Sequence, residues 1–155
     1  MTLKIGQKAP LFSAPDQNDK QHSLKDYLGS WVVLYFYPKD DTPGCTKEAC
    51  SFRDSFPKFK KIEATVFGVS IDSVKRHQKF AEKYELPFTL LSDEDKKIVE
   101  SYGVWQKKKF MGKEYMGIVR TSFLIDPKGK IAKIYEGVKP DTHVEQVLKD
   151  LRELF

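Results

Sequence analysis

The residues of this chain that could do covalent chemistry are its two cysteines, which lie five positions apart in one stretch. This stretch is Pro38-Lys-Asp-Asp-Thr-Pro-Gly-Cys45-Thr-Lys-Glu-Ala-Cys50. A cysteine thiolate is a nucleophile, and two cysteines this close in a compartment that keeps thiols reduced are poor candidates for a structural crosslink. The pair therefore indicates redox or catalytic use.

The segments on either side are expected to hold Cys45 at the start of a helix. The run 31–37 is apolar and rich in β-favouring residues, which predicts a central strand that is covered on both faces. With Thr42 as the N-cap of the next helix, Pro43 takes the first helical position and Cys45 the third. Free backbone N–H groups and the positive end of the helix dipole then surround the sulfur and favour the thiolate. Gly44 leaves room for a small molecule.

The predicted helix carries one apolar stripe, which Cys45 heads. Its members recur at spacings of four and three residues and are Cys45, Ala49, Phe52, Phe56 and Phe59. The sulfur should therefore lie at the rim of the core, where a partly dry pocket strengthens the hydrogen bonds that reach it. Pro57 is expected to kink or end the helix.

The second cysteine cannot reach the first while this helix is intact. Cys50 lies about 140° round the helix from Cys45, which puts the two Cα atoms roughly 8–9 Å apart. A disulfide requires Cα atoms within about 7 Å of each other. The two sulfurs can therefore pair only if the first helical turns unwind, so the segment would need two states.

The remaining pattern alternates strands and helices. The predicted elements are strands at 65–71, 88–91, 122–126 and 130–135, and helices that follow Ser73, Ser92 and Thr142. Ser92 and Asp95 are expected to form a capping box. The segment 103–119 has no clear period and is predicted to be a loop. We expect an α/β protein with a thioredoxin-like fold, in which helices flank a central mixed β-sheet and residues 1–30 form an N-terminal extension.

Composition narrows the class of protein. At 155 residues and 40% hydrophobic content, the chain 1–155 is expected to form a single domain. The net charge of +5 is spread along the sequence, and its densest basic run, Lys107-Lys-Lys109, is too short for a nucleic-acid groove. No signal core or membrane-spanning run is evident. We expect a soluble, cytoplasmic protein with no nucleic-acid or membrane partner.

The pattern Pro38-x-x-x-Thr42-x-x-Cys45 resembles the active-site signature of the peroxiredoxins. The longer stretch that ends at Cys50 is similar to the Q-type peroxiredoxins, also called bacterioferritin comigratory proteins. The likeness continues through Phe52-Arg-Asp54, Tyr102-Gly-Val-Trp105, Phe110-Met-Gly-Lys113 and Gly117-Ile-Val-Arg120-Thr-Ser-Phe-Leu-Ile-Asp126. It implies a thiol peroxidase without metal or prosthetic group, acting on hydrogen peroxide and alkyl hydroperoxides. Many Q-type relatives are monomers, so a monomer is expected.

The resemblance also implies a role for each matched residue. Cys45 would be the peroxidatic cysteine, which attacks the peroxide O–O bond and becomes a sulfenic acid. Cys50 would resolve that sulfenic acid as an intramolecular disulfide, which thioredoxin or a similar dithiol protein would reduce. Thr42 would hydrogen-bond sulfur and peroxide, and Pro38 would shield the pocket. Arg120 would stabilise the thiolate and the leaving oxygen.

Two other functions fit parts of the sequence. A thiol–disulfide oxidoreductase would suit the fold, but such enzymes typically use a Cys-x-x-Cys motif. A non-enzymatic basic interaction module would leave the Thr-Pro-Gly-Cys turn unexplained.

Several side chains near the motif have simpler expected roles. Lys39, Asp40 and Asp41 are expected to be solvated loop charges. His77 lies on an apolar helix face and is expected to be packed or hydrogen-bonded rather than an acid–base group. Trp105 and Phe110 could cover the site, dock the reductant or pack in the core.

Overall fold

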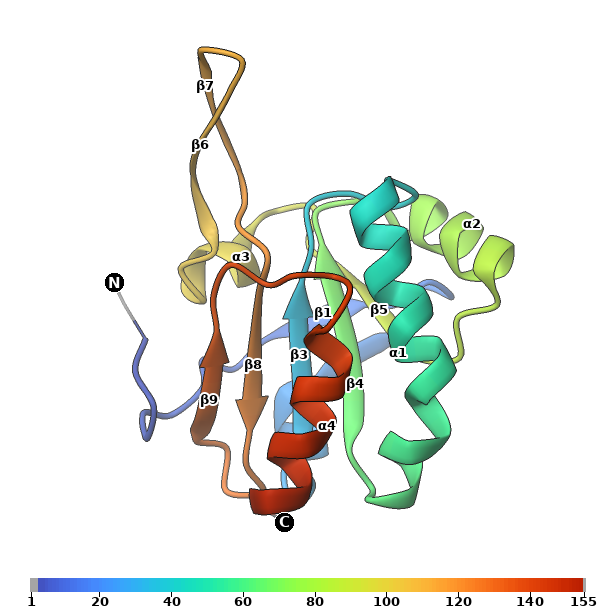
Figure 1. Cartoon of the computed structure of the whole chain (residues 1–155), viewed down its shortest axis with the longest axis vertical. Coiled ribbons are helices and arrows are strands. Elements are labelled where there is room, and N and C mark those ends of the chain that lie inside the picture. Colours follow the sequence, from blue (N-terminus) through green and yellow to red (C-terminus); the bar gives the residue numbers. More distant parts are fainter. Residues whose placement is uncertain (1–2, 155) are drawn as a thin grey trace.

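The computed structural model describes residues 3–154, and a five-stranded mixed sheet lies at its centre (Figure 1). In spatial order the strands are β5 (Thr89–Ser92), β4 (Thr65–Ser70), β3 (Val32–Phe36), β8 (Thr121–Ile125) and β9 (Ile131–Tyr135). Strands β3, β4 and β5 are mutually parallel, while β8 runs antiparallel to β3 and β9 antiparallel to β8. The apolar run 31–37 thus forms the middle strand, and the predicted thioredoxin-like fold is confirmed.

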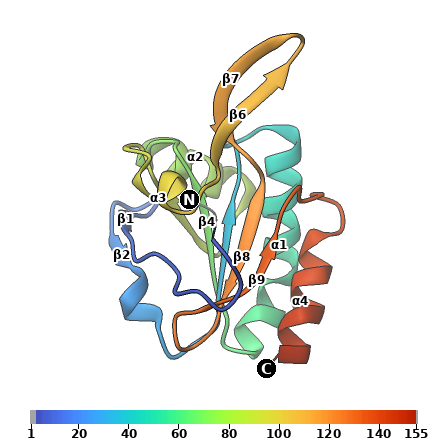
Figure 2. The ribbon, with the colours of Figure 1, turned by 90° about the vertical axis from the view of Figure 1, so that its left-hand side faces the viewer.

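Different elements cover the two faces of the sheet. The helices are α1 (Pro43–Lys61), α2 (Val74–Tyr84), α3 (Lys97–Ser101) and α4 (His143–Leu154). Helices α1 and α4 lie side by side on one face, as Figures 1 and 2 show. Helix α2 adds Phe80 to the apolar cluster on that face. The opposite face is covered by α3 and by the N-terminal segment.

The N-terminal segment matches its prediction in outline. It contains the antiparallel strands β1 (Ser13–Pro15) and β2 (Gln21–Ser23) and the short helix η1 (Leu24–Tyr27). The two strands form a small sheet of their own rather than joining the central one. Leu24, which is fully buried, fixes this segment against the central sheet.

Two helix starts show how well capping was predicted. The Ser73 side chain accepts a hydrogen bond from the Arg76 N–H at 3.2 Å and caps α2, as its place in the sequence suggests. The expected capping box of Ser92 and Asp95 is wrong. Ser92 still belongs to β5, and the carboxylate of Asp93 instead accepts the N–H groups at the start of α3.

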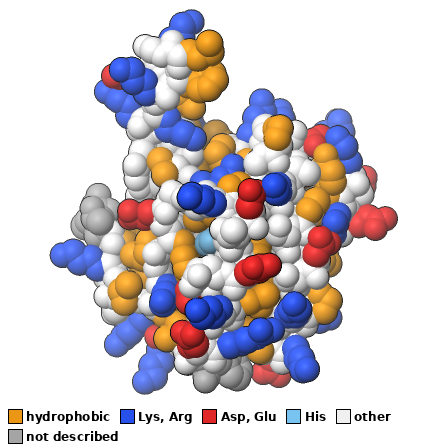
Figure 3. Space-filling view, in the orientation of Figure 1, with side chains coloured by type: hydrophobic (Ala, Val, Ile, Leu, Met, Phe, Trp, Pro, Cys, Tyr) orange, Lys and Arg blue, Asp and Glu red, His pale blue; other side chains and the backbone are white. Residues whose placement is uncertain are grey.

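The expected loop at 103–119 is also wrong, because most of it forms a β-hairpin. Strands β6 (Trp105–Phe110) and β7 (Lys113–Ile118) pair in antiparallel register and project from the body of the protein (Figures 1 and 2). Met111 and Gly112 join them with φ angles of 51° and 80°, as a two-residue hairpin turn requires. Both faces of the hairpin mix lysines with apolar side chains and are largely exposed, so the strands lack the usual alternation. Figure 3 shows this mixture on the side of the hairpin that faces the viewer.

No helix within residues 3–154 is long and apolar enough to cross a membrane.

Candidate active site

Cys45 lies in the first turn of α1, where the sequence predicts it. Thr42 is the N-cap, with φ −103° and ψ 157°, and Pro43 opens the helix. The first intrahelical hydrogen bond joins the Thr46 N–H to the Thr42 carbonyl at 2.8 Å, so the N–H groups before Thr46 have no helical acceptor. The Cys45 side chain is 2% exposed and belongs to the apolar cluster between α1, α4 and the sheet.

The apolar stripe anchors the rest of α1. Ala49, Phe52 and Phe59 are buried, and Phe56 packs against the same cluster. The ring of Phe52 stacks on Tyr35 of the central strand, with centroids 4.5 Å apart and an interplanar angle of 18°. The helix does not end at Pro57 but continues through it to Lys61.

Arg120 reaches the sulfur from the segment between β7 and β8. Its Nη2 donates to Cys45 Sγ at 3.4 Å, and its Nη1 donates to Glu48 Oε1 at 2.7 Å. The guanidinium is largely buried, because the arginine side chain is 16% exposed. The structure thus places a positive charge beside the thiol, from a residue that the sequence indicates only through the family resemblance.

Glu48 is a member of this site that the sequence reasoning missed. Its side chain is fully buried, and Oε2 has no hydrogen-bond partner among the described residues. Burial raises the pKa of Glu48 from 4.5 to about 7, which outweighs the opposite effect of the Arg120 charge. The sequence does contain an indication of this placement. Glu48 follows Cys45 by three positions, so the two side chains lie on the same face of the helix.

The threonine and the glycine of the motif make local contacts that the sequence does not indicate. The Thr42 hydroxyl donates to the Lys39 carbonyl at 2.8 Å and makes no capping hydrogen bond, although the residue stands at the N-cap. A Cβ on Gly44 would lie 3.1 Å from Arg120 Nη2. The missing side chain of Gly44 therefore makes room for the arginine itself.

The other two motif residues precede and follow Cys45 in the chain. Pro38 stands two residues after the end of β3 and is half-buried in the loop that leads to α1. Cys50 is also half-buried, and both cysteines are free thiols. Since both belong to one continuous α1, helix geometry keeps their Cα atoms roughly 8–9 Å apart.

Asp40 is not a solvated charge, which corrects the prediction for this loop. It is 3% exposed, and its carboxylate contacts the Tyr37 hydroxyl and His77 Nδ1, each at 2.6 Å. The prediction for His77 is confirmed, since its second nitrogen, Nε2, lies 2.9 Å from the Leu91 carbonyl. Asp41 is exposed and pairs with Lys83 at 2.8 Å, as a surface charge would.

A second buried histidine adds no charge near the sulfur. His143, the first residue of α4, contacts the Ser122 hydroxyl through Nε2 at 2.7 Å. Burial, followed by the nearby Arg120 charge, lowers the pKa of His143 to about 4. His143 is therefore neutral near pH 7.

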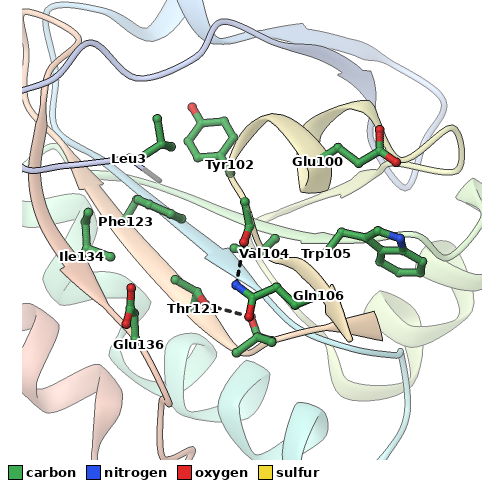
Figure 4. Close-up of a pocket in the computed structure, with 12 residues that line it drawn as sticks. Leu3, Glu100, Tyr102, Val104, Trp105, Gln106, Thr121, Phe123, Ile134 and Glu136 are labelled. Carbon is green, nitrogen blue, oxygen red and sulfur yellow. Dashed lines mark hydrogen bonds between the residues drawn. The ribbon is translucent and has the colours of Figure 1, made fainter. Parts of the chain in front are cut away.

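Trp105 and Phe110 do not belong to the apolar cluster that contains Cys45. Trp105 packs against the cluster on the opposite face of the sheet, and Phe110 is 66% exposed on the hairpin. Trp105 lines a cavity of about 620 Å³ whose floor includes Phe123 and Ile134 (Figure 4). These floor residues also face away from Cys45, so the cavity is separate from the candidate site.

Fold and site together define a thiol-dependent enzyme, and comparisons with known proteins specify which kind. The AhpC/TSA family model matches residues 5–134. Peroxiredoxin Bcp of Bacillus subtilis is 49% identical over 99% of this chain and 98% of its own. A cysteine mutant of Xylella fastidiosa PrxQ superposes with a TM-score of 0.94 at 36% identity, covering 99% of this chain and 98% of that one.

A third relative is the bacterioferritin comigratory protein of Xanthomonas campestris, which was studied for its alkyl peroxide reduction activity. It is 37% identical, has a TM-score of 0.88, and the match covers 92% of this chain and 90% of that one. The chain therefore belongs to the AhpC/TSA family, as a thiol-dependent peroxidase of the Q-type peroxiredoxins.

Proposed function

We propose that Cys45 is the peroxidatic residue of this enzyme, with hydrogen peroxide and alkyl hydroperoxides as substrates. The Cys45 thiolate attacks one peroxide oxygen, the O–O bond breaks, and an alkoxide or hydroxide leaves and takes a proton. The sulfur is oxidised to a sulfenic acid while the peroxide is reduced to an alcohol or water. The observation that carries this proposal is the Arg120 Nη2 at 3.4 Å from a buried thiol in the first turn of a helix.

The surrounding residues take complementary parts in this step. Arg120 supplies positive charge where the thiolate and the leaving oxygen carry negative charge. The single hydroxyl hydrogen of Thr42 is already donated to Lys39, so Thr42 Oγ1 offers the peroxide an acceptor. Pro38 shields the site from water at the start of the same loop. No metal or prosthetic group takes part in the proposed step.

Cys50 completes the cycle in this proposal. Its thiol condenses with the Cys45 sulfenic acid, which releases water and leaves a disulfide. Because the intact helix keeps the Cα atoms too far apart, the first turns of α1 unwind before the bond forms. Thioredoxin or a similar dithiol protein then reduces the disulfide and becomes oxidised itself.

The decisive experiment measures peroxide consumption with a thioredoxin system. Cys45→Ser should abolish turnover, whereas Cys50→Ser should still complete one oxidation and stop at a sulfenic acid that a dimedone-type probe traps. Mass spectrometry of the wild type after one equivalent of peroxide should show the Cys45–Cys50 bond. Peroxide turnover by Cys45→Ser would refute the assignment, and insulin reduction without peroxide turnover would favour a thiol–disulfide oxidoreductase.

We also propose that the enzyme is a cytoplasmic, single-domain monomer. The reactive roles proposed for both cysteines suit a compartment that keeps thiols reduced. Light scattering of the reduced and oxidised protein would test the monomer, and limited proteolysis would test whether residues 1–155 form one unit.

A further inference from the structure

A buried polar cluster lies behind the loop that carries Thr42. It joins Asp40 of the loop to Asp72 after β4 and to His77 of α2, and these side chains are 3%, 8% and 0% exposed. Asp72 Oδ2 accepts the Ser70 hydroxyl at 2.7 Å and the Asp40 backbone N–H at 2.8 Å. Arg76 Nε lies 3.2 Å from Asp72 Oδ1. Burial of two carboxylates is thus offset by specific donors.

His77 fixes the Asp40 carboxylate by the direction of its own hydrogen bonds. The Leu91 carbonyl can only accept, so His77 Nε2 carries a hydrogen and donates it at 2.9 Å. The second ring nitrogen, His77 Nδ1, lies 2.6 Å from Asp40 Oδ2, so the imidazole is held at both nitrogens. With the Tyr37 hydroxyl on Oδ1, both oxygens of Asp40 are bound.

This cluster acts on the site through a single peptide group. The N–H of Asp40 and the carbonyl of Lys39 belong to the same planar unit and point in opposite directions. Asp72 binds the N–H end at 2.8 Å, and the Thr42 hydroxyl binds the carbonyl end at 2.8 Å. The orientation of this peptide group therefore decides where the hydroxyl hydrogen of Thr42 points.

We propose that Asp72, together with the Asp40–His77 pair, is a positioning device for the peroxide reaction. It fixes the Lys39–Asp40 peptide group so that the Thr42 hydroxyl hydrogen is held on the Lys39 carbonyl and Thr42 Oγ1 presents only lone pairs to the peroxide O–H. This inference rests on the proposed role of Thr42. Without the cluster the peptide group could turn, and the hydroxyl hydrogen would be free to point at the peroxide or the sulfur.

The test compares two reactions of the same thiol in a Cys50→Ser background. Stopped-flow measurements give the rate constant of Cys45 with hydrogen peroxide, and iodoacetamide gives its alkylation rate, which needs no contact with Thr42. Asp72→Ala should lower the peroxide rate constant by about 10- to 100-fold, as loss of positioning does. The alkylation rate should stay within about threefold of the parent. Asp72→Asn keeps one acceptor oxygen, so it should lower the peroxide rate constant less than Asp72→Ala does.

A double-mutant cycle shows whether the effect passes through Thr42. In a Thr42→Val background, Asp72→Ala should cause little further loss, because the group it positions is gone. A full additional loss, or an equal loss of alkylation rate, would overturn the proposal. Should Asp72→Ala not fold, Ser70→Ala removes one donor from Asp72 and should give a smaller loss with the same non-additivity.

The outcomes separate this inference from the proposed function. If Thr42→Val leaves the peroxide rate constant unchanged, the positioning device is refuted while Cys45 keeps its role. If Cys45→Ser still consumes peroxide, the proposed function itself fails.

Discussion

The Glu48 carboxyl should make the stability of this protein depend on pH in a way that one substitution removes. Glu48 is fully buried, and its pKa rises from 4.5 to about 7 because burial penalises the carboxylate. Glu48→Gln keeps the size and shape of the side chain and its contact with Arg120, but it cannot ionise. The variant therefore isolates the cost of holding a charged Glu48 in the folded protein.

The sign and size of the effect follow from proton linkage. The folded state binds the Glu48 proton more tightly than the unfolded chain does. The stabilisation of the folded state by this proton is therefore fully present below pH 4.5 and is lost as the pH rises through about 7. A tenfold change in an ionisation constant corresponds to about 1.4 kcal/mol, so the full effect is roughly 3 kcal/mol. Between pH 5 and 8, the free energy of unfolding of the wild type should fall relative to Glu48→Gln by roughly 2–3 kcal/mol.

Urea unfolding of the reduced protein at several pH values measures this difference directly. Asp93, whose pKa burial raises to about 6, and His143, whose pKa is lowered to about 4, also give pH dependence. Asp93 and His143 are present in both the wild type and the variant. Their effects therefore cancel when the free energy of unfolding of one protein is subtracted from that of the other at each pH. Glu145→Gln takes one carboxylate from an exposed position of α4 and serves as the matched control. Parallel curves for the wild type and Glu48→Gln would refute the reasoning.

Three further substitutions test the packing of the site. Gly68→Ala puts a Cβ 2.8 Å from the Tyr35 ring and should lower the free energy of unfolding in urea by about 1–3 kcal/mol; an unchanged midpoint would contradict that contact. Gly44→Ala crowds Arg120 Nη2 at 3.1 Å and should slow the stopped-flow peroxide reaction several-fold while the fold, checked by circular dichroism, is kept. Arg120→Lys loses the two-pronged donor and should slow that reaction by about 10²–10³-fold, and a rate equal to wild type would exclude the arginine from the Cys45 site.

The elements that the sequence predicts correctly are those with a one-sided or fully buried pattern. The continuous apolar run 31–37 became the central strand, and the stripe headed by Cys45 became the buried face of α1. The hairpin at 105–118 was not predicted. Most of its side chains are exposed on both faces, so its sequence shows no alternation of apolar and polar residues. Its turn also lacks the usual Asn-Gly or Asp-Gly pair.

The candidate site was predictable only in part, and for a physical reason. The position of Cys45 in the first helical turn follows from local rules for Thr42 and Pro43. Arg120 was identified only by resemblance to a family, because its partners are far away in the chain. Asp40 looks like an ordinary loop charge, and the position of Glu48 three residues after Cys45 is the one sequence feature that relates it to the site. The packed structure shows that both side chains are buried.

The long separation between Cys45 and Arg120 also has a consequence for biosynthesis. The two residues that meet at the sulfur are 75 positions apart, and Arg120 stands directly before β8, which pairs with β3. During translation at about 5–20 residues per second, the thiol emerges several seconds before its arginine has been made. Fast reaction with peroxide should therefore appear only after β8 has joined the sheet. Peroxide reactivity of Cys45 would then report, on the ribosome or in a refolding experiment, that the chain has completed its fold.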